Sequence, residues 1–300
     1  PPPPPPPPPP VSSRRRHTRY FLASRGLGDV YKRQVDISIR DRAQYTYFLE
    51  NTELEHSEVE KDLGVYIDNR LKFDSHISTK INKANNILGA IRRSFSYIDS
   101  TIMLRLYTSL IRPHLEYANP VWNPRYKKDI SNIENVQKRA TKLIPTLREL
   151  PYKERLKALK LPSLAYRRLR GDMIEVYKLT QGKYDPEVSD LLCKQNEILP
   201  NTANRTRGHS QKLYKRKHRI QLRKHNFTYR VVDPWNSLPE MVVSSPTINT
   251  FERRLDSFWQ NQEIKYDFKK CLRITHPNNA PGREFVEDID EDDDEPEVQN

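Results

Sequence analysis

The chain has 300 residues, which is enough for one or two domains with hydrophobic cores of their own. Its net charge of +13 hides three unequal parts: residues 1–34 carry seven Lys/Arg and one Asp, residues 284–300 carry ten Asp/Glu and no Lys/Arg, and the body between them carries +17. A body this basic suits a phosphate-binding protein, although a merely cationic surface gives the same composition.

Cysteine use and hydropathy exclude several classes of protein. Cys193 and Cys271 belong to no Cys/His cluster, so neither a zinc site nor a disulfide framework is indicated. No apolar run of about 18 residues could span a membrane, and no charged start followed by an apolar core resembles a signal peptide. We therefore expect an intracellular protein of the nucleus or cytoplasm, not secreted, with no membrane partner and no small-molecule substrate.

Residues 1–34 are excluded from the fold prediction. They begin with ten prolines, which favour polyproline II and could serve as a ligand for an SH3 or WW domain. The continuation from Val11 to Gln34 resembles translated sequencing-adapter text, so its triple arginine is not interpreted as a nuclear signal. We expect this segment to be disordered.

Residues 35–74 are expected to form a β-hairpin. Residues 45–49 are rich in β-forming side chains, and residues 63–67 alternate apolar and polar or small residues at the period of a strand. From Ile77 the apolar spacing changes to steps of three and four, which predicts a helix.

A helical bundle is expected over residues 75–184. The predicted helices run from an N-cap at Ser75 to Phe95, from Asp99 or Ser100 to a stop at Pro113, from an N-cap at Asp129 to Ile144, from Tyr152 to Leu159, and from Pro162 as first helical residue to about Thr180, with Gly182 ending the last one. Their apolar stripes predict a hydrophobic core rather than a cofactor site.

Three bundle residues, His114, Glu116 and Trp122, invite a catalytic interpretation, since an imidazole and a carboxylate stand two residues apart. No Ser or Cys nucleophile motif accompanies them. We therefore expect a packed histidine rather than an active site.

Basic residues predict the candidate binding site. The last bundle helix carries Arg167, Arg168 and Arg170 as a cationic shoulder, and residues 201–232, the basic segment, hold ten Lys/Arg, three His and no acid. Cations can follow phosphates while interleaved aromatics stack on unpaired bases; a flexible cationic loop is the alternative. The candidate nucleic-acid-binding residues are Lys212, Tyr214, Lys215, Arg216, Lys217, Arg219, Arg223, Lys224, Phe227, Arg167 and Arg168. We expect no catalytic and no metal-ligating residue.

The C-terminal third is expected to form a basic domain over residues 185–270. Residues 185–200 hold a short helix, residues 227–232 a strand, and residues 233–239 a turn whose Trp235 and Leu238 anchor a core. A final helix begins at Asn249 or Thr250 and places Phe251, Leu255, Phe258 and Trp259 on one side. Residues 271–300 are expected to be a disordered acidic tail that can fold back on the basic segment.

An ordered series of segments carries a resemblance to a known family. They are Lys61–Val65 with Leu71–Phe73 and His76–Ile77, Leu106–Ala118 with Val121–Pro124, Ile133–Ala140, Arg230–Val232 with Trp235–Pro239, and Phe251–Asp256. The series resembles the part that follows the catalytic palm in non-LTR retrotransposon reverse transcriptases of the jockey/CR1-like type. It covers roughly Tyr45 to Trp259, and no single segment is a chemical motif.

The resemblance implies a palm edge, a thumb-like bundle and a post-thumb region. The fold class is then mainly α with a small β component: an N-terminal hairpin, a helical thumb-like bundle, a C-terminal helical region with one or two short strands, and disordered ends. In that family two palm aspartates hold the Mg²⁺ ions of nucleotide addition. Adjacent aspartates occur here only at 292–294, in the acidic tail, so we expect no cofactor and no polymerase activity on this chain.

Two functions follow. The first is a C-terminal fragment of an RNA-directed DNA polymerase that retains template and primer binding, with RNA, DNA and the missing N-terminal polymerase portion as partners. The alternative is a domesticated, non-catalytic helical module whose charge serves protein partners. An upstream reading frame that encodes the paired aspartates would support the first; a stop codon and an initiator Met before Val35 would support the second.

Overall fold

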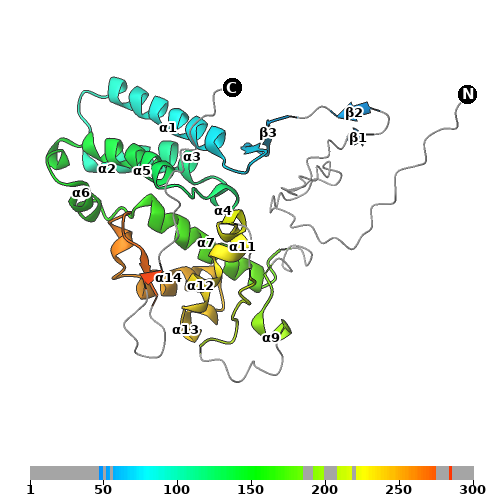
Figure 1. Ribbon diagram of the computed structural model, residues 1–300. Coiled ribbons are helices and arrows are strands. Elements are labelled where there is room, and N and C mark those ends of the chain that lie inside the picture. The colour runs from blue at the N-terminus through cyan, green and yellow to red at the C-terminus, as the bar shows by residue number, and fades with distance from the viewer. Residues whose placement is uncertain are drawn as a thin grey trace, which may run out of the picture.

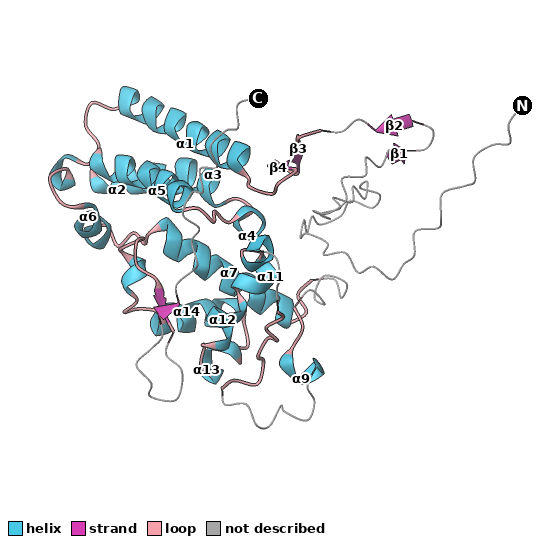
Figure 2. Cartoon of the chain, in the orientation of Figure 1, coloured by secondary structure: helices cyan, strands magenta, loops and turns pink. Residues whose placement is uncertain are grey.

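The computed structural model describes residues 47–49, 52–54, 57–184, 192–198, 208–217, 221–274 and 284–285. The chain is mainly helical with short antiparallel strand pairs, which confirms the predicted fold class in outline (Figure 2). Helices α1, α2, α3 and α5 form one layer, α7 crosses beneath it, and the shorter helices of the C-terminal third lie on the other side of α7 (Figure 1).

The helices and strands succeed one another as follows. Their bounds are β1 Tyr47–Leu49, β2 Thr52–Leu54, β3 Val59–Asp62, β4 Val65–Asp68, α1 Asp74–Ser94, α2 Ser100–Leu106, η1 Tyr107–Ile111, α3 Arg112–Glu116, α4 Asn119–Trp122, α5 Lys127–Lys142, η2 Pro145–Leu147, α6 Tyr152–Ala158, α7 Leu164–Thr180, α9 Gln195–Ile198, α10 Gln221–Lys224, α11 Phe227–Arg230, α12 Val232–Asn236, α13 Glu240–Val243, α14 Ile248–Phe258, η4 Glu263–Lys265, β5 Leu272–Arg273 and β6 Glu284–Phe285. The acidic tail after Phe285 and residues 1–34 lie outside the described residues.

Hairpin β3–β4 confirms the N-terminal hairpin, with a correction to its strand. The strand expected across residues 63–67 is interrupted, because Leu63 and Gly64 form the two-residue turn between Asp62 and Val65, which are paired. Both turn residues have positive φ (45° and 83°), as a type I′ hairpin turn requires. The Tyr117 hydroxyl donates to the Leu63 carbonyl at 2.7 Å and helps to hold this costly conformation.

Helix α1 begins without the predicted serine cap. Phe73, in the left-handed region, stands at the N-cap position, and Ser75 lies inside the helix. The Asp68 carboxylate organises the approach by accepting the backbone N–H groups of Arg70, Lys72 and Phe73 at 2.9, 3.0 and 2.5 Å. A loop closed by an aspartate thus replaces the local cap that the sequence predicted.

The second predicted helix does not stop at Pro113. Asp99 caps it as expected, accepting the N–H of Ile102 at 2.7 Å, but the chain stays helical through η1 to the end of α3. The reason is that η1 is a π-helix: Arg112 N–H bonds to the Tyr107 carbonyl, five residues back. The wider turn tolerates a proline that would clash within an α-helix.

Other predicted boundaries need correction. Tyr126, rather than Asp129, precedes α5, and Ser163, rather than Pro162, opens α7 by accepting the Tyr166 N–H at 3.1 Å. The strand predicted at 227–232 is wrong: this stretch is α11 and the start of α12, capped by Asn226. The predicted end of α7 at Gly182 is confirmed, since Gly182 has φ 61° and the chain closes with reverse hydrogen bonds to the last turn.

Two hydrophobic cores fill the described chain. One extends from Val65 to Leu164, and the other from Ala165 to Ile274. Helix α7 lies between them, because its first residue, Leu164, belongs to the first core and its other buried apolar residues belong to the second. Trp235 and Leu238 are buried in the second core, as predicted. Phe251, Leu255 and Trp259 are buried as well, but Phe258 is 39% exposed, which corrects the predicted apolar side of α14.

A buried polar network joins the two cores. Glu134 and Gln137 of α5 are fully buried, a role that the apolar spacing of this helix did not reveal. Glu134 accepts from the Tyr152 hydroxyl (2.6 Å) and from the N–H of Leu164 (3.1 Å). Gln137 accepts from the Tyr107 hydroxyl (2.5 Å) and donates to the Pro162 carbonyl (3.0 Å). Burial raises the pKa of Glu134, and the hydrogen bond from Tyr152 opposes the rise.

The hairpin is attached to the bundle through His76 of α1. Its Nδ1 accepts the N–H of Tyr66 at 3.2 Å, and its ring lies 5.0 Å from the ring of Trp122. Trp122 in turn donates from Nε1 to the Tyr117 carbonyl at 2.6 Å. Burial, with a smaller contribution from Lys80, lowers the pKa of His76 to about 4.

This depressed pKa predicts acid sensitivity of the hairpin attachment. Because the folded-state pKa lies below the ordinary value of 6.5, the stabilisation is complete above pH 6.5 and is lost as the pH falls towards 4. We expect His76→Asn to destabilise the protein at pH 7, and the gap to the wild type to narrow by about 2 to 3 kcal/mol at pH 4.5. Denaturant unfolding at both pH values measures this; parallel pH profiles would contradict it.

Candidate nucleic-acid interface

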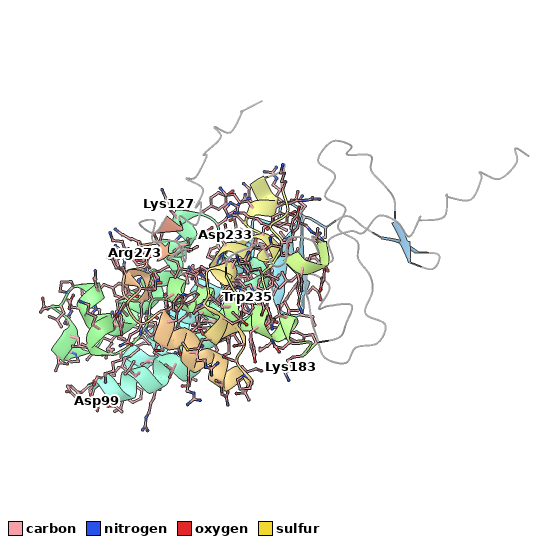
Figure 3. The ribbon with its side chains drawn as sticks, turned by 90° about the horizontal axis from the view of Figure 1, so that it is seen from below. Asp99, Lys127, Lys183, Asp233, Trp235 and Arg273 are labelled. Carbon is pink, nitrogen blue, oxygen red and sulfur yellow. The ribbon has the colours of Figure 1, made fainter. Side chains whose placement is uncertain are left out.

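The described part of the basic segment is fixed to the second core rather than loose. Leu213 donates its N–H to Asn236 Oδ1 at 2.8 Å, and Asn236 returns a bond to the Leu213 carbonyl at 2.9 Å. Buried His209 contacts the Trp235 carbonyl at 3.0 Å, and Trp235 Nε1 donates to the Gln211 carbonyl at 2.8 Å. Figure 3 shows Trp235 among the densely packed side chains, with Asp233 near it.

The predicted cations of the segment differ in their surroundings. Lys215 pairs with Asp233, and the Arg216 guanidinium contacts the Cys193 thiol. Lys217 and Arg223 are exposed, Lys224 is half-buried, and burial lowers the pKa of Lys212. Arg219 lies outside the described residues. The segment therefore presents a few cations, held at defined positions, to solvent.

The two aromatic candidates also differ. Phe227 is only 6% exposed and packs in the second core beneath the Arg230 guanidinium, which lies 5.4 Å from the ring centroid. The interpretation of Phe227 as a base-stacking residue is therefore corrected: its ring has no face available. Tyr214 is half-buried, with its backbone N–H bound to the Cys193 carbonyl at 2.9 Å, and remains a candidate.

The arginines of α7 make internal ion pairs instead of a cationic shoulder. Arg167 binds both carboxylate oxygens of Glu116. Arg168 is 5% exposed and lies near Glu134 and Asp172; burial raises the pKa of both carboxyls, and the charge of Arg168 opposes that rise. Arg170 pairs with Asp256 at 2.6 Å and with Glu252 at 3.1 Å. The helix is thus neutralised by its neighbours.

A cluster outside the predicted site residues has the properties that those arginines lack. We call it the hairpin–helix patch; it comprises Lys61 and Tyr66 of the hairpin, Lys80 and Lys83 of α1, His114 of α3, and Tyr117 just after α3. Lys61 Nζ lies 5.4 Å from the Tyr66 ring centroid, and Lys80 Nζ lies 5.4 Å from that of Tyr117. Tyr117 is 50% exposed.

The patch is electrostatically uncompensated. Within the part of the chain that the structure describes, no acidic side chain pairs with Lys61, Lys80 or Lys83. Burial and then Lys61 lower the pKa of Lys80, and burial, Lys80 and Lys83 together lower the pKa of His114. Such mutual repulsion is relieved by a bound anion, and phosphate is the anion that lysine clusters commonly bind.

The sequence contained a signal for this patch that the prediction did not use. Lys80 and Lys83 fall outside the apolar positions of α1, and Lys61 begins the first family-like segment. What joins them is the hairpin: Tyr66 of β4 bonds to His76 of α1, and the Leu63–Gly64 turn meets Tyr117, just after α3. This contact is long-range and cannot be inferred from spacing along the chain.

The suspected catalytic group does not assemble. His114 and Glu116 are two residues apart on a helix, so they do not share a face. Glu116 is occupied by Arg167 and lies 3.7 Å from Arg112, and Trp122 is buried in the first core. Among the described residues, no three His, Cys, Asp or Glu side chains gather as a metal site would need, and no helix is long and apolar enough to cross a membrane.

Comparison with known proteins yields a distant likeness. No family model and no solved structure matches the chain. Over 145 residues the chain is 25% identical to an uncharacterized protein of Caenorhabditis elegans, B0403.1, which covers 47% of this chain and 72% of that protein. The likeness is too distant to assign a family.

The two aromatic residues of the basic segment should behave differently on mutation. Phe227→Ala removes a buried ring and should lower the free energy of unfolding by about 3 to 5 kcal/mol. Tyr214→Ala should leave stability nearly unchanged and, if the ring stacks on bases, weaken binding of a single-stranded oligonucleotide by about 1 to 3 kcal/mol. Denaturant unfolding and fluorescence anisotropy test the pair; a stable Phe227→Ala with a binding defect would reverse our assignment.

Proposed function

We propose that this chain is the palm-edge, thumb and post-thumb portion of a non-LTR retrotransposon reverse transcriptase, and that it binds template and primer nucleic acid without catalysing nucleotide addition. The observation that carries the proposal is that the family-like segments contact one another across long sequence distances. Segments that resemble one family in order, and also pack together as one unit, are better explained by a shared fold than by chance.

The contacts connect successive segments. Tyr117, in the second segment, binds the Leu63 carbonyl of the first, and Trp122 packs against His76. Tyr107 of the second segment binds Gln137 of the third at 2.5 Å. The resembled residues thus serve mainly as internal connectors, which explains why none of these segments looks like a chemical motif.

The last two segments are joined in the same way. Trp235 and Phe251 lie with ring centroids 6.0 Å apart in the second core. Arg230 of the fourth segment forms a buried bidentate pair with Asp172 of α7 and donates at 3.2 Å to the carbonyl of Pro120, which lies between the two stretches of the second segment. A buried pair of this kind fixes orientation more than it adds stability.

Charge supports nucleic acid as the ligand. The hairpin–helix patch combines uncompensated lysines with half-exposed tyrosines, the combination that follows a phosphate backbone and stacks on bases. In the proposed assignment the missing N-terminal polymerase portion supplies the Mg²⁺-binding aspartates, and this chain contributes binding.

A second candidate function is the domesticated protein-interaction module. It is favoured by one observation: the α1–α2 connection exposes Tyr97 to 64% and Phe95 to 40%, beside Arg92 and Arg93. Exposed aromatics and arginines are typical of protein interfaces. A chain that binds no nucleic acid at low salt, yet captures a protein through Tyr97, would favour this function over the first.

Salt dependence tests the binding function. The affinity for single-stranded RNA or DNA should fall linearly with salt on a log-log plot, with a slope of about −0.7 per phosphate contact. Changing Lys61, Lys80 and Lys83 to Ala should reduce the slope magnitude by about 2 and weaken all sequences similarly, because phosphate contacts do not specify sequence. The triple variant of Lys215, Arg216 and Lys217 should have a smaller effect, since Lys215 is ion-paired and Arg216 contacts Cys193.

A matched control removes the same charge elsewhere. Lys153, Lys157 and Lys178 pair with Asp267, Glu154 and Glu175, so their replacement by Ala should leave the slope nearly unchanged. Equal losses in the control and the hairpin–helix variant would mean that only net charge matters.

The absence of catalysis has its own test. The purified chain should extend no primer on an RNA template with Mg²⁺ or Mn²⁺, because the paired aspartates are not among its segments. Primer extension above that of a mock preparation would overturn this part of the proposal.

A further inference from the structure

The chain carries its own polyanion. Residues 286–300 contain nine Asp/Glu and no Lys or Arg, and all nine lie within the eleven positions 287–297. A run of carboxylates at this density presents negative charge at intervals comparable to those of a nucleic-acid backbone. The described chain enters this tail from β6, which pairs with β5, Leu272 opposite Phe285.

The tail is long enough to reach much of the surface of the body. Fifteen residues span at most about 50 Å when fully extended. A compact body of roughly 200 residues has a radius of gyration near 16 Å, hence a diameter of roughly 40 to 45 Å. The path over the surface to the opposite side of such a body is roughly 65 Å, so the tail reaches much of the surface but not all of it. Within that range, the distribution of uncompensated charge selects the docking site.

Cations near β5 are already paired. Arg273 lies 2.7 Å and Lys270 lies 3.8 Å from Glu263, and Lys153 lies 3.7 Å from Asp267. The basic segment is partly compensated in the same way, through Lys215 and Asp233. The hairpin–helix patch differs, because Lys61 and Lys80 lie over the neighbouring rings of Tyr66 and Tyr117, and no described acidic side chain pairs with Lys61, Lys80 or Lys83.

We propose that the acidic residues of the 286–300 tail dock on the hairpin–helix patch and compete there with nucleic acid. The competition rests on the proposed function, whereas the docking itself does not. A tethered tail acts at an effective concentration in the millimolar range, so even a weak contact is populated and lowers the apparent affinity for a polyanion. High salt or a long nucleic acid displaces the tail from the patch. A short nucleic acid must therefore reach a higher concentration before it binds.

Docking is tested without nucleic acid. In the whole chain at low salt, carbodiimide cross-linking should join carboxylates of residues 287–297 to Lys61, Lys80 or Lys83, as mapped by mass spectrometry. High salt should abolish these cross-links. Cross-links confined to Lys215 and Lys217, or to the lysines beside β5, would overturn the proposal, and so would their absence.

Competition is tested with a charge-neutral tail of the same length. Replacing the nine Asp/Glu by Asn/Gln should tighten binding of single-stranded RNA by roughly tenfold at low salt. The same replacement in the Lys61, Lys80 and Lys83→Ala background should have little effect, because the site of competition is gone. An equal gain in both backgrounds would show general charge repulsion and overturn the docking site. If neither tail variant binds RNA, the proposed function fails, while the cross-links still decide docking.

Discussion

The arrangement of this protein depends on a carboxylate with no access to water. Glu134 accepts the first N–H of α7 and the Tyr152 hydroxyl, and neighbouring Gln137 holds the carbonyl of Pro162 just before the helix. Because α7 forms one wall of the second core, these bonds fix the C-terminal region against the bundle. A buried carboxylate is costly unless all its partners are present, so the junction allows few alternative geometries.

Charge is used in two distinct ways in this chain. Arginines of α7 and α11 form internal ion pairs that join segments far apart in the sequence. Arg167 pairs with Glu116, and Arg230 pairs with Asp172. Lysines of β3 and α1 are left uncompensated at the surface. This division agrees with the chemistry of the two side chains, since the planar guanidinium suits buried bidentate pairs and the ammonium suits solvated ones.

Much of the fold could be predicted from spacing alone. The bundle helices, the Asp99 cap and the Gly182 terminus follow from local signals that packing reinforces. Boundaries failed where a distant contact replaced a local one, as when Asp68 closed the approach to α1 in place of a Ser75 cap. The strand predicted at 227–232 failed because β-forming side chains there are buried in short helices, a choice made by the second core.

The candidate site was the least predictable part. The density of charged residues along the sequence predicted the basic segment, but it does not show which side chains are ion-paired or buried. Phe227 of that segment and Arg168 of α7 are both buried. Lys61 and Lys83 are separated by more than twenty positions and by a hairpin turn, so only the folded chain shows that they share one patch.

The π-helix at Tyr107–Ile111 has a consequence for how this chain can change. A π turn is equivalent to one extra residue accommodated within an α-helix, and it shifts the phase of everything after it by about 100° relative to what precedes it. Tyr107 and Leu115 both belong to the first core, and the shift brings their side chains closer to one face of the helix. Deletion of one residue between them would restore regular α-helical hydrogen bonding but would change which side chains face the first core. The length of this stretch is therefore constrained more tightly than its composition.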